Sequence, residues 1–538
     1  MDIEHIVVLM LENNSFDRML GSVPGVDGVD PAHPRTNPDL NGALVPERTT
    51  TMRTMLCDPA DPNSKKIDPS HDLPDVLEQM SGGNQGFVKN FERNNSQCKP
   101  DAWAEVMKYY GLGSLPVLHL LARSFAVCDQ WFSSLPGPTW PNRYFVHSGT
   151  SLGHVDMPEG IFHPNLHWYN QDTVYDRLDT AGKSWAIYYG DVPQTLTMTH
   201  MLGHPTHFHT MGKFFTDASG PEAAFPQYSF IEPTYFGAQQ NDQHPPSDVL
   251  RGEVLLAQVY NAIRANQALW EKTLLVVSYD EHGGFYDHVT PPACVPPDQH
   301  VSEFSFAQYG IRVPAVLISP WLEAQVISDG FDHTSLLKYV TDLWGLGPLG
   351  ARTAAAKSFA SSWKVAAAVR TDVPGRIPEP TTLPNPEVDG LNPNQLALVG
   401  FSRYLETKTV ALSAKKGPTA AKAMTMAVAQ RMLRSTAQDT HGEVAVQRVA
   451  EFLKLARQIP IDPKTGEPVA GKPTRAKKAP AKRAAKKTAA KKAKKVSARA
   501  VSKKAARPAA KKATKSAAKK AGANSGKKGA KKKSAKRR

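Results

Sequence analysis

Two adjacent carboxylates, Asp280 and Glu281, follow the apolar run 273–279 and precede a His-Gly-Gly sequence. The run is typical of a strand buried on both faces of a parallel sheet. Open α/β sheets place their chemistry at the carboxyl ends of such strands. Neighbouring carboxylates repel each other, and a divalent cation held by oxygen ligands would offset that repulsion. A solvated acidic turn after a core strand is the alternative.

The strand-like segment 5–11 ends in the same way, because Glu12 and Asn13 follow it directly. Carboxylate and amide oxygens at the same ends of neighbouring strands can converge on one cation. Either end alone is compatible with a capped loop, whereas the two together predict a site for one divalent metal ion. All-oxygen ligands suit Ca²⁺ or Mg²⁺, and catalytic Zn²⁺ also accepts carboxylates, so the sequence leaves the metal open.

Thr139 lies between Pro138 and Pro141, in a segment that predicts the start of a helix because proline suits the first helical turn. Free N–H groups and the helix dipole favour an anion at that end. The hydroxyl of Thr139 could simply cap the helix. Alternatively, beside a divalent metal, it is a nucleophile whose target phosphoryl oxygens bind to the N–H groups. Asn142, one turn further on, could donate to the same oxygens.

Histidines occur in two loops and in one dense cluster. His71 lies in the loop 68–72 and His244 in the proline-containing loop 241–246. A lone loop histidine is usually a surface residue, and spacing alone favours that interpretation for His71. The cluster could bind phosphate or metal, although loose clusters also arise without function. Its members are His200, His204, His207 and His209.

Strand-like and helical patterns alternate from residue 5 to about residue 345, which predicts an α/β fold with a doubly wound, mostly parallel sheet and helices on both faces. We expect residues 22–70 to be a long irregular excursion. The expected strands cover 5–11, 124–132, 182–190, 227–232, 273–279 and 312–320. The expected helices cover 73–80, 116–123, 173–180, 249–269 and 336–343, together with one that begins near Thr139.

The chain divides by composition into four parts. We expect a catalytic domain over 1–372, a proline-rich connector over 373–396, a helical segment over 397–459 and a disordered basic tail over 460–538. Helix-like patterns after the connector cover about 395–412, 418–434 and 442–457. The final residues are almost only Ala, Lys, Arg and Ser, from which no core can form.

The formal net charge of +15 is concentrated at one end of the chain. Of the 65 Lys and Arg residues, 29 lie in 471–538, a segment with no acidic residue. Residues 1–470 contain the other 36 basic residues and all 50 acidic residues, so they carry a net charge of −14. A tail of this kind favours a nucleic acid or another polyanion as a partner, and anionic lipid attracts the same residues. A solubilising appendage is the plainer interpretation.

The first strand begins too early to follow a signal peptide, and no run of about 18 apolar residues predicts a membrane span. The four cysteines lie far apart without metal-ligand spacing: Cys57, Cys98, Cys128 and Cys294. We therefore expect reduced cysteines and a cytoplasmic protein, which the tail could bring to the nucleoid or to a membrane surface.

With these motifs together, the chain resembles the bacterial phosphoesterase family of phosphatidylcholine-type phospholipases C and certain acid phosphatases, a branch of the alkaline-phosphatase-like superfamily. The resemblance covers roughly residues 1–360, and several ordered motifs of this length are a specific signal. The motifs that carry it cover 12–17, 138–143, 241–245, 280–288 and 312–314. The tail is outside this pattern and resembles the Ala-Lys repeats of histone-H1-like bacterial proteins.

The resemblance implies that one metal ion is bound by Glu12, Asn13, Asp280 and Glu281. It implies that Thr139 attacks phosphorus. It also implies that His71 and His244 contact the phosphoryl oxygens or serve the leaving group, and that a further histidine comes from 200–209.

Departures from the family pattern concern the mouth of the site and export. The family commonly has Arg where Asn14 stands and His where Arg18 stands. Many members carry a twin-arginine export signal, which this sequence lacks, so an extracellular lipid substrate is in doubt.

The leading hypothesis is metal-dependent, phospholipase C-like hydrolysis of a phosphate ester through a covalent phosphothreonine. The substrate would be a phospholipid or a small phosphoester. An acid phosphatase-type monoesterase is the first alternative. A nucleic-acid-binding protein whose tail is the functional part is the second.

Overall fold

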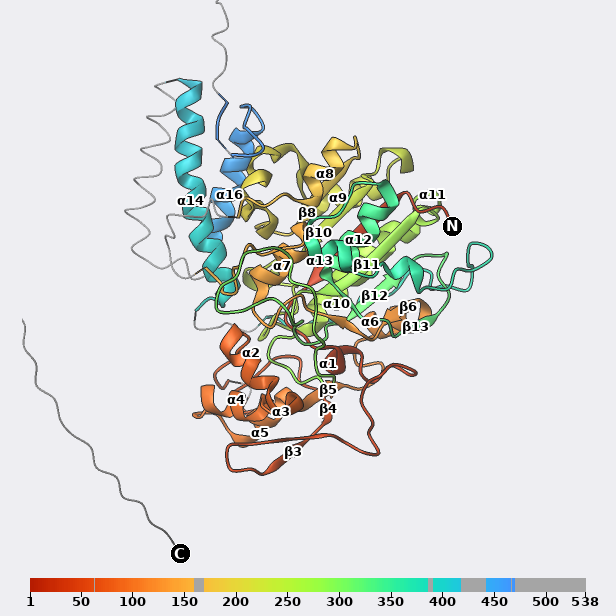
Figure 1. Cartoon of the computed structure of the whole chain (residues 1–538), viewed down its shortest axis with the longest axis vertical. Coiled ribbons are helices and arrows are strands. Elements are labelled where there is room, and N and C mark those ends of the chain that lie inside the picture. The colour runs from red at the N-terminus through yellow and green to blue at the C-terminus, as the bar shows by residue number, and fades with distance from the viewer. Residues whose placement is uncertain (62, 159–168, 386–389, 418–441, 466, 470–538) are drawn as a thin grey trace, which may run out of the picture. The chain divides into compact units, whose positions relative to one another are not determined.

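The two apolar runs that precede the predicted acids form the centre of the sheet. Strand β1 (His5–Leu11) pairs in parallel with β11 (Thr273–Tyr279), with His5 opposite Thr273 and Leu11 opposite Tyr279. Every residue of both strands is buried, so both faces of the sheet are covered. The structure is a computed structural model that describes residues 1–469 except 62, 159–168, 386–389, 418–441 and 466 (Figure 1).

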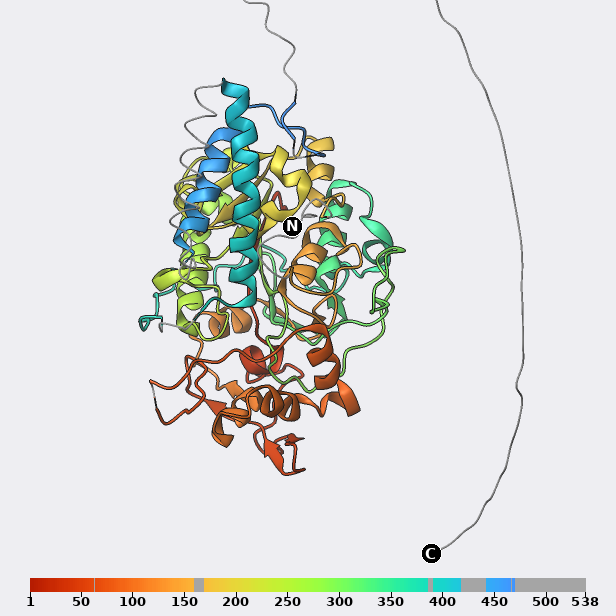
Figure 2. The ribbon, with the colours of Figure 1, turned by 90° about the vertical axis from the view of Figure 1, so that its left-hand side faces the viewer.

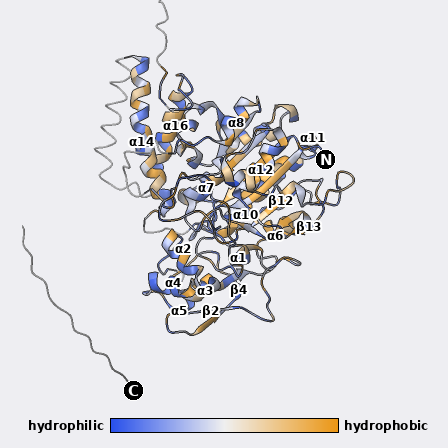
Figure 3. Cartoon of the chain, in the orientation of Figure 1, coloured by the Kyte–Doolittle hydropathy of each residue, from blue (hydrophilic) through white to orange (hydrophobic). Residues whose placement is uncertain are grey.

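Strands from distant parts of the sequence surround this pair. The remaining strands are β2 (Thr36–Pro38), β3 (Leu44–Pro46), β4 (Arg48–Thr50), β5 (Lys108–Tyr110), β6 (Ala126–Cys128), β7 (Trp131–Phe132), β8 (Trp185–Tyr189), β9 (Phe208–Thr210), β10 (Tyr228–Glu232), β12 (Ala315–Ile318), β13 (Gln325–Ile327) and β14 (Phe331–Asp332). The main sheet has the order β13-β6-β12-β11-β1-β10-β8-β9, and its strands are among the most hydrophobic segments (Figure 3).

The predicted mostly parallel α/β sheet is confirmed, with one reversed strand. The strand expected over 312–320 is β12, which runs antiparallel to both β11 and β6. The other pairings in the main sheet are parallel. The strand expected over 124–132 is divided into β6 and β7, because β7 leaves the main sheet to pair with β14.

The helices begin close to the predicted positions. They are α1 (Phe16–Leu20), α2 (Leu73–Gln79), α3 (Ser81–Asn84), α4 (Phe87–Asn94), α5 (Pro100–Trp103), α6 (Leu118–Ser124), α7 (Thr139–Ser148), α8 (Val174–Thr180), α9 (Met211–Ala218), α10 (Val249–Ala265), α11 (Gln267–Trp270), α12 (His333–Trp344), α13 (Gly350–Ala355), α14 (Pro393–Lys416) and α16 (Glu443–Ala456). The helix expected over 249–269 is interrupted at Asn266, whose side chain caps α11.

The segment between β1 and α6 forms a lobe with its own apolar core, drawn in red and orange at the lower end of the view (Figure 1). Part of the excursion expected over 22–70 is regular, because β2 pairs with β3 and β4 pairs with β5. Phe285 and Tyr286, from the loop after β11, pack into this second core. The lobe is therefore anchored beside the strand end that carries the acids.

The C-terminal helices pack on each other (Figure 2). Helices α14 and α16 confirm two of the three predicted helical segments, and 418–434 lies outside the described residues. The chain up to Lys472 forms one compact unit. Residues 461 and 468 form a β-bridge, so the described structure continues past the expected start of the tail at 460. The Lys-rich tail lies outside the described residues.

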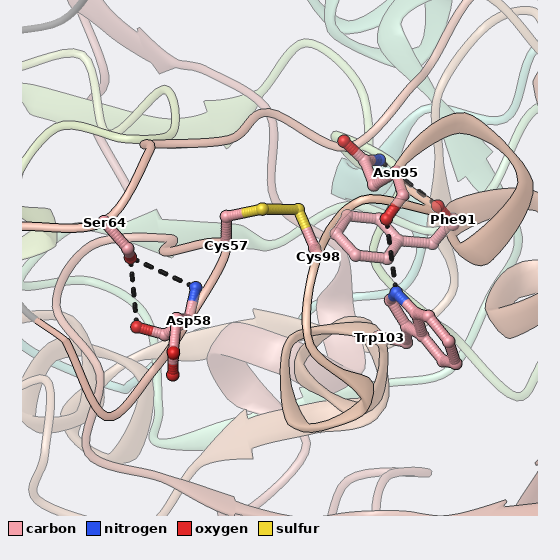
Figure 4. Close-up of a disulfide and its surroundings, with 7 residues drawn as sticks. All are labelled: Cys57, Asp58, Ser64, Phe91, Asn95, Cys98 and Trp103. Carbon is pink, nitrogen blue, oxygen red and sulfur yellow. Dashed lines mark hydrogen bonds between the residues drawn. A yellow bond between two sulfur atoms is a disulfide. The ribbon is translucent and has the colours of Figure 1, made fainter.

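The expectation that all four cysteines are reduced is wrong for two of them. Cys57 and Cys98 form a disulfide, and Cys128 and Cys294 are free (Figure 4). The bond joins positions 41 residues apart within the lobe, and His71 lies between them in the chain. Sequence spacing could not show this pairing, because only the fold of the lobe brings the two thiols together.

Among the described residues, no helix combines the length and the apolar character that crossing a membrane requires.

Replacing both Cys57 and Cys98 with serine should lower the free energy of unfolding by about 4 kcal/mol, because the open loop gains conformational entropy in the unfolded chain. Denaturant unfolding followed by tryptophan fluorescence measures this loss. Cys294→Ser, which removes a free thiol, serves as the control. If the double variant and the parent, kept without reductant, were equally stable, the Cys57–Cys98 disulfide would be contradicted.

Candidate active site

The ends of β1 and β11 bring the predicted acids together in the interior. Glu12, Asp280 and Glu281 are completely buried. The two strand ends are joined by hydrogen bonds from Asn13 N to Asp280 Oδ1 (3.1 Å) and from Asn14 N to Glu281 O (3.0 Å). The structure therefore places these acids and Asn13 in one buried cluster, as neighbouring parallel strands require.

Asn13 adopts an unusual backbone conformation at the centre of this cluster. Its φ angle is +57°, a left-handed value that few residues other than glycine adopt. Gly283 packs against it so closely that a side-chain carbon at Gly283 would lie 2.2 Å from the Asn13 carbonyl oxygen. Gly283, the first glycine of the pair, is therefore required by this close approach.

Arg143 supplies a basic neighbour that the sequence analysis did not identify. Its fully buried guanidinium lies 3.0 Å from Asp280 Oδ2 through Nε and 3.2 Å from Glu12 Oε1 through Nη2. Burial raises the pKa of Asp280 to about 6, although Arg143 opposes the rise. Burial also raises the pKa of Glu12 well above its ordinary value. Part of the charge of the acids is therefore balanced by the protein itself.

Three oxygens of the cluster remain without a hydrogen bond among the described residues. They are Glu12 Oε2, Asn13 Oδ1 and Glu281 Oε1, all buried. Leaving a buried polar atom unpaired costs about 1–3 kcal/mol. Oxygen atoms of this kind are the ligands that hard divalent cations prefer. The donor types of these residues therefore fit the predicted cation, while Glu12, Asp280 and Glu281 are not among the described groups whose ligand atoms all lie within 4.8 Å of one another.

Thr139 is the first residue of α7, and it is almost completely buried. Pro138 occupies the N-cap in an extended conformation, and no side chain caps the helix. The plainer interpretation of Thr139 as a capping residue therefore does not hold. Arg143, which contacts the buried acids, follows Thr139 by four positions, so the two residues lie one turn apart on the same side of α7.

Asn142 has a different environment from the one predicted. Its Oδ1 accepts hydrogen bonds from Ser134 N and Leu135 N, and its Nδ2 donates to the carbonyls of Leu135, Gly137 and Pro138. Its amide is thus occupied by the loop that leads into α7. This does not favour donation to a phosphoryl oxygen, and it makes Asn142 a residue that positions the turn before Thr139.

His71 and His244 lie together beside the acids, with ring centres 5.9 Å apart. His71 Nε2 is 3.2 Å from Asn13 Nδ2 and 4.0 Å from Glu281 Oε1. Burial alone would lower the pKa of His71, but the carboxylates of Glu281 and Asp68 raise it to about 9. His244 donates from Nδ1 to the Pro245 carbonyl, which leaves its buried Nε2 3.7 Å from Asp68 Oδ2.

The dense histidine cluster lies elsewhere. His200 pairs with Asp176, and His204 pairs with Asp179. His207 donates to the Trp185 carbonyl and stacks on the Trp185 ring. The rings of His209 and Tyr188 are 5.9 Å apart. The expectation that one of these histidines joins the site is therefore not supported, because they pack around β8 and α8.

Two other histidines contact the acids directly. His333, at the start of α12, donates from Nε2 to the Asp280 carbonyl at 2.7 Å. His282 Nδ1 lies 3.3 Å from Glu281 Oε2, and its Nε2 lies 2.8 Å from Gln79 Oε1. Burial opposes ionisation of Glu281, yet the charges of His71 and His282 hold its pKa below the ordinary value.

Arg312 fixes the loop that follows the acids. Its buried guanidinium binds Asp287 (2.8 Å) and Asp17 (3.0 Å), one residue from each of the two strand-end segments. It also donates to the carbonyls of Asp27 and Asp129. This network joins the segments after β1 and β11 to the chain before β12. The sequence motifs over 12–17, 280–288 and 312–314 are therefore connected in the fold.

Comparison with known proteins identifies the family to which this buried site belongs. The model of the phosphoesterase family matches residues 3–347. The chain belongs to the phosphoesterase family. The protein is therefore a phosphoric ester hydrolase, as the sequence analysis predicted.

Curated relatives of this phosphoesterase are similar over most of the described chain. Non-specific phospholipase C3 of Arabidopsis thaliana is 37% identical over 374 residues, 62% of this chain and 68% of the relative. Non-specific phospholipase C4 of the same plant is 34% identical over 384 residues, 64% and 68% of the two chains. Phospholipase C A of Mycobacterium tuberculosis strain H37Rv is 30% identical over 394 residues, 64% and 73% of the two chains.

Solved structures that resemble this phosphoesterase include a protein in the alkaline phosphatase superfamily from Vibrio parahaemolyticus. The two share 12% identity with a TM-score of 0.29, over 47% of this chain and 66% of that chain. A likeness of this size carries no argument about function.

Arg143→Met should lower the free energy of unfolding of this phosphoesterase by about 3–5 kcal/mol in the presence of a chelator, because two buried carboxylates lose their counter-charge. Added divalent cation should stabilise the variant more than the parent, since its charge would replace that of the guanidinium. Urea unfolding with and without cation measures both effects. Arg143→Lys, which keeps the charge, is the control. Unchanged stability of Arg143→Met would refute this charge balance.

Proposed function

We propose that the protein is a metal-dependent, phospholipase C-like phosphodiesterase that forms a covalent phosphothreonine at Thr139. The observation that carries this proposal is an uncapped, buried threonine at a helix N-terminus, one turn before Arg143, which contacts buried acids with unpaired oxygens. Membership of the phosphoesterase family supports the reaction class. The similarity to phospholipases C supports a diester substrate.

One divalent ion would be held by Glu12, Asn13, Asp280 and Glu281. When bound, such an ion stabilises negative charge on a phosphoryl oxygen and on an attacking alkoxide. The donor set contains oxygen alone, which suits Ca²⁺ or Mg²⁺, and Zn²⁺ remains compatible.

Each of the protein groups has its own role in the proposed reaction. Thr139 Oγ1 gives up its proton to water and attacks phosphorus, so the Oγ1–P bond forms while the bond from phosphorus to the leaving oxygen breaks. The N–H group of Thr139 and the dipole of α7 favour the negative phosphoryl oxygens. His71 and His244 contact those oxygens or protonate the leaving oxygen. Water then attacks phosphorus and releases Thr139.

Hydrolysis of p-nitrophenyl phosphorylcholine by the full chain should exceed hydrolysis of p-nitrophenyl phosphate, and a chelator should abolish both. Thr139→Ala should reduce turnover by roughly a thousandfold or more, as loss of a nucleophile does. Thr139→Ser should retain part of the activity, because it keeps the hydroxyl. The release of p-nitrophenol measures all three results.

Undiminished turnover by Thr139→Ala would refute the covalent mechanism. A preference for the monoester would make the protein an acid phosphatase-type monoesterase. Full activity in chelator, after the protein has been stripped of metal, would refute the metal dependence.

The basic tail supports a second role, which is compatible with the first. Its 29 positive charges without a single acid favour binding to a nucleic acid or another polyanion through release of counterions. It contains no aromatic residue, so base stacking is not expected.

Deletion of residues 471–538 should abolish salt-sensitive binding to DNA while leaving ester hydrolysis intact. Electrophoretic mobility shift assays over a range of salt concentrations, with vesicles of anionic lipid as a competing partner, measure this. Retention of DNA binding by the truncated protein would contradict the role of the tail.

A further inference from the structure

The first turn of α14 reaches the buried acids from a part of the chain beyond the family match, which ends at residue 347. Asn394, in this turn, is 1% exposed. Its Nδ2 donates to Glu12 Oε1 at 2.8 Å, and its Oδ1 accepts from Trp140 Nε1 at 2.8 Å. The indole N–H only donates and the carboxylate only accepts, so the two partners define the orientation of the amide.

This contact determines which oxygen of Glu12 remains available. Oε1 accepts the Asn394 hydrogen bond and lies 3.2 Å from Arg143 Nη2. Oε2 is buried and has no hydrogen-bond partner among the described residues. The amide therefore holds the carboxylate in the rotamer that leaves one oxygen free. Because Trp140 follows Thr139 directly, the same amide also ties Glu12 to the turn that carries the nucleophile.

The turn itself is anchored independently of the acids. Asn392 and Gln395 form a capping box at the start of α14, and Pro393 stands in its first position. Gln395 also donates to the Tyr235 carbonyl. Asn394 is therefore presented by a rigid helix start.

The same turn borders two cavities beside His71. One, of about 440 Å³, is lined by Asp68, Pro245 and Pro393 among others. The other, of about 730 Å³, is lined by Asp72, Met157, Pro393 and Leu396 among others. Met157 Sδ also accepts a hydrogen bond from the backbone N–H of Trp140, which places the second cavity next to the turn of Thr139.

We propose that Asn394 is a positioning residue of the active site, which orients the Glu12 carboxylate for cation binding and couples it to the turn that bears Thr139. The proposal rests on the cation site of the proposed function. It gives the first turn of α14 a role in the site. This turn lies beyond the family match, which ends at residue 347.

Isothermal titration of the full-length, chelator-stripped protein with Ca²⁺, Mg²⁺ and Zn²⁺, each alone, tests the proposal. Asn394→Ala should weaken the affinity of the cation that the parent binds by about 10–100-fold, as loss of a group that orients a metal ligand does. Thr409→Ala is the matched control: it removes a buried hydrogen bond to the Leu405 carbonyl from the same helix without touching Glu12 or the first turn, and it should leave the affinity unchanged. The cation concentration for half-maximal hydrolysis should shift in the same proportion.

Trp140→Phe replaces the indole with a smaller aromatic ring that lacks the N–H holding Asn394, so it should weaken affinity in the same direction even if Asn394→Ala does not fold. Parental affinity in both variants, or an equal loss in Thr409→Ala, would overturn the proposal. A parent that binds none of the three cations would overturn the cation site itself, and this inference with it.

Discussion

The parallel, in-register pairing of β1 with β11 is the interaction on which the rest of the site depends. Because Leu11 lies opposite Tyr279, the next residues, Glu12 and Asp280, leave the sheet side by side at its carboxyl edge. Both strands are fully buried, so their terminal acids enter a region without solvent. A shift of one residue in the register would send these side chains to opposite faces and separate them.

Burying several carboxylates together costs several kcal/mol for each ion unless charges and hydrogen bonds offset the loss of water. The protein meets part of this cost with Arg143 from α7 and with His71 from the small lobe. Three separate segments contact the acids, through Arg143, His71 and Asn394. The remaining unpaired oxygens are where a divalent cation would complete the balance.

The sequence predicted the strands, the acids and the helix that begins at Thr139, because each of these is marked by a local pattern. Arg143 was missed because nothing local shows which residues of α7 face the sheet edge. The histidines of 200–209 were misleading, since density along the chain does not determine proximity in the fold. The pairing of Cys57 with Cys98 depends on the fold of the lobe, and it weakens the expectation of a cytoplasmic protein, because disulfides persist mainly in oxidising compartments.

The most direct test of the account is a crystal structure of the protein grown with Ca²⁺ or Zn²⁺, in which anomalous scattering locates the bound metal. The account predicts one strong anomalous peak in contact with oxygens of Glu12, Asn13, Asp280 and Glu281. It would be contradicted by a peak at the neighbouring group of Asp68, His71 and His244, whose ligand atoms lie within 4.8 Å of one another, with none at the four oxygen ligands.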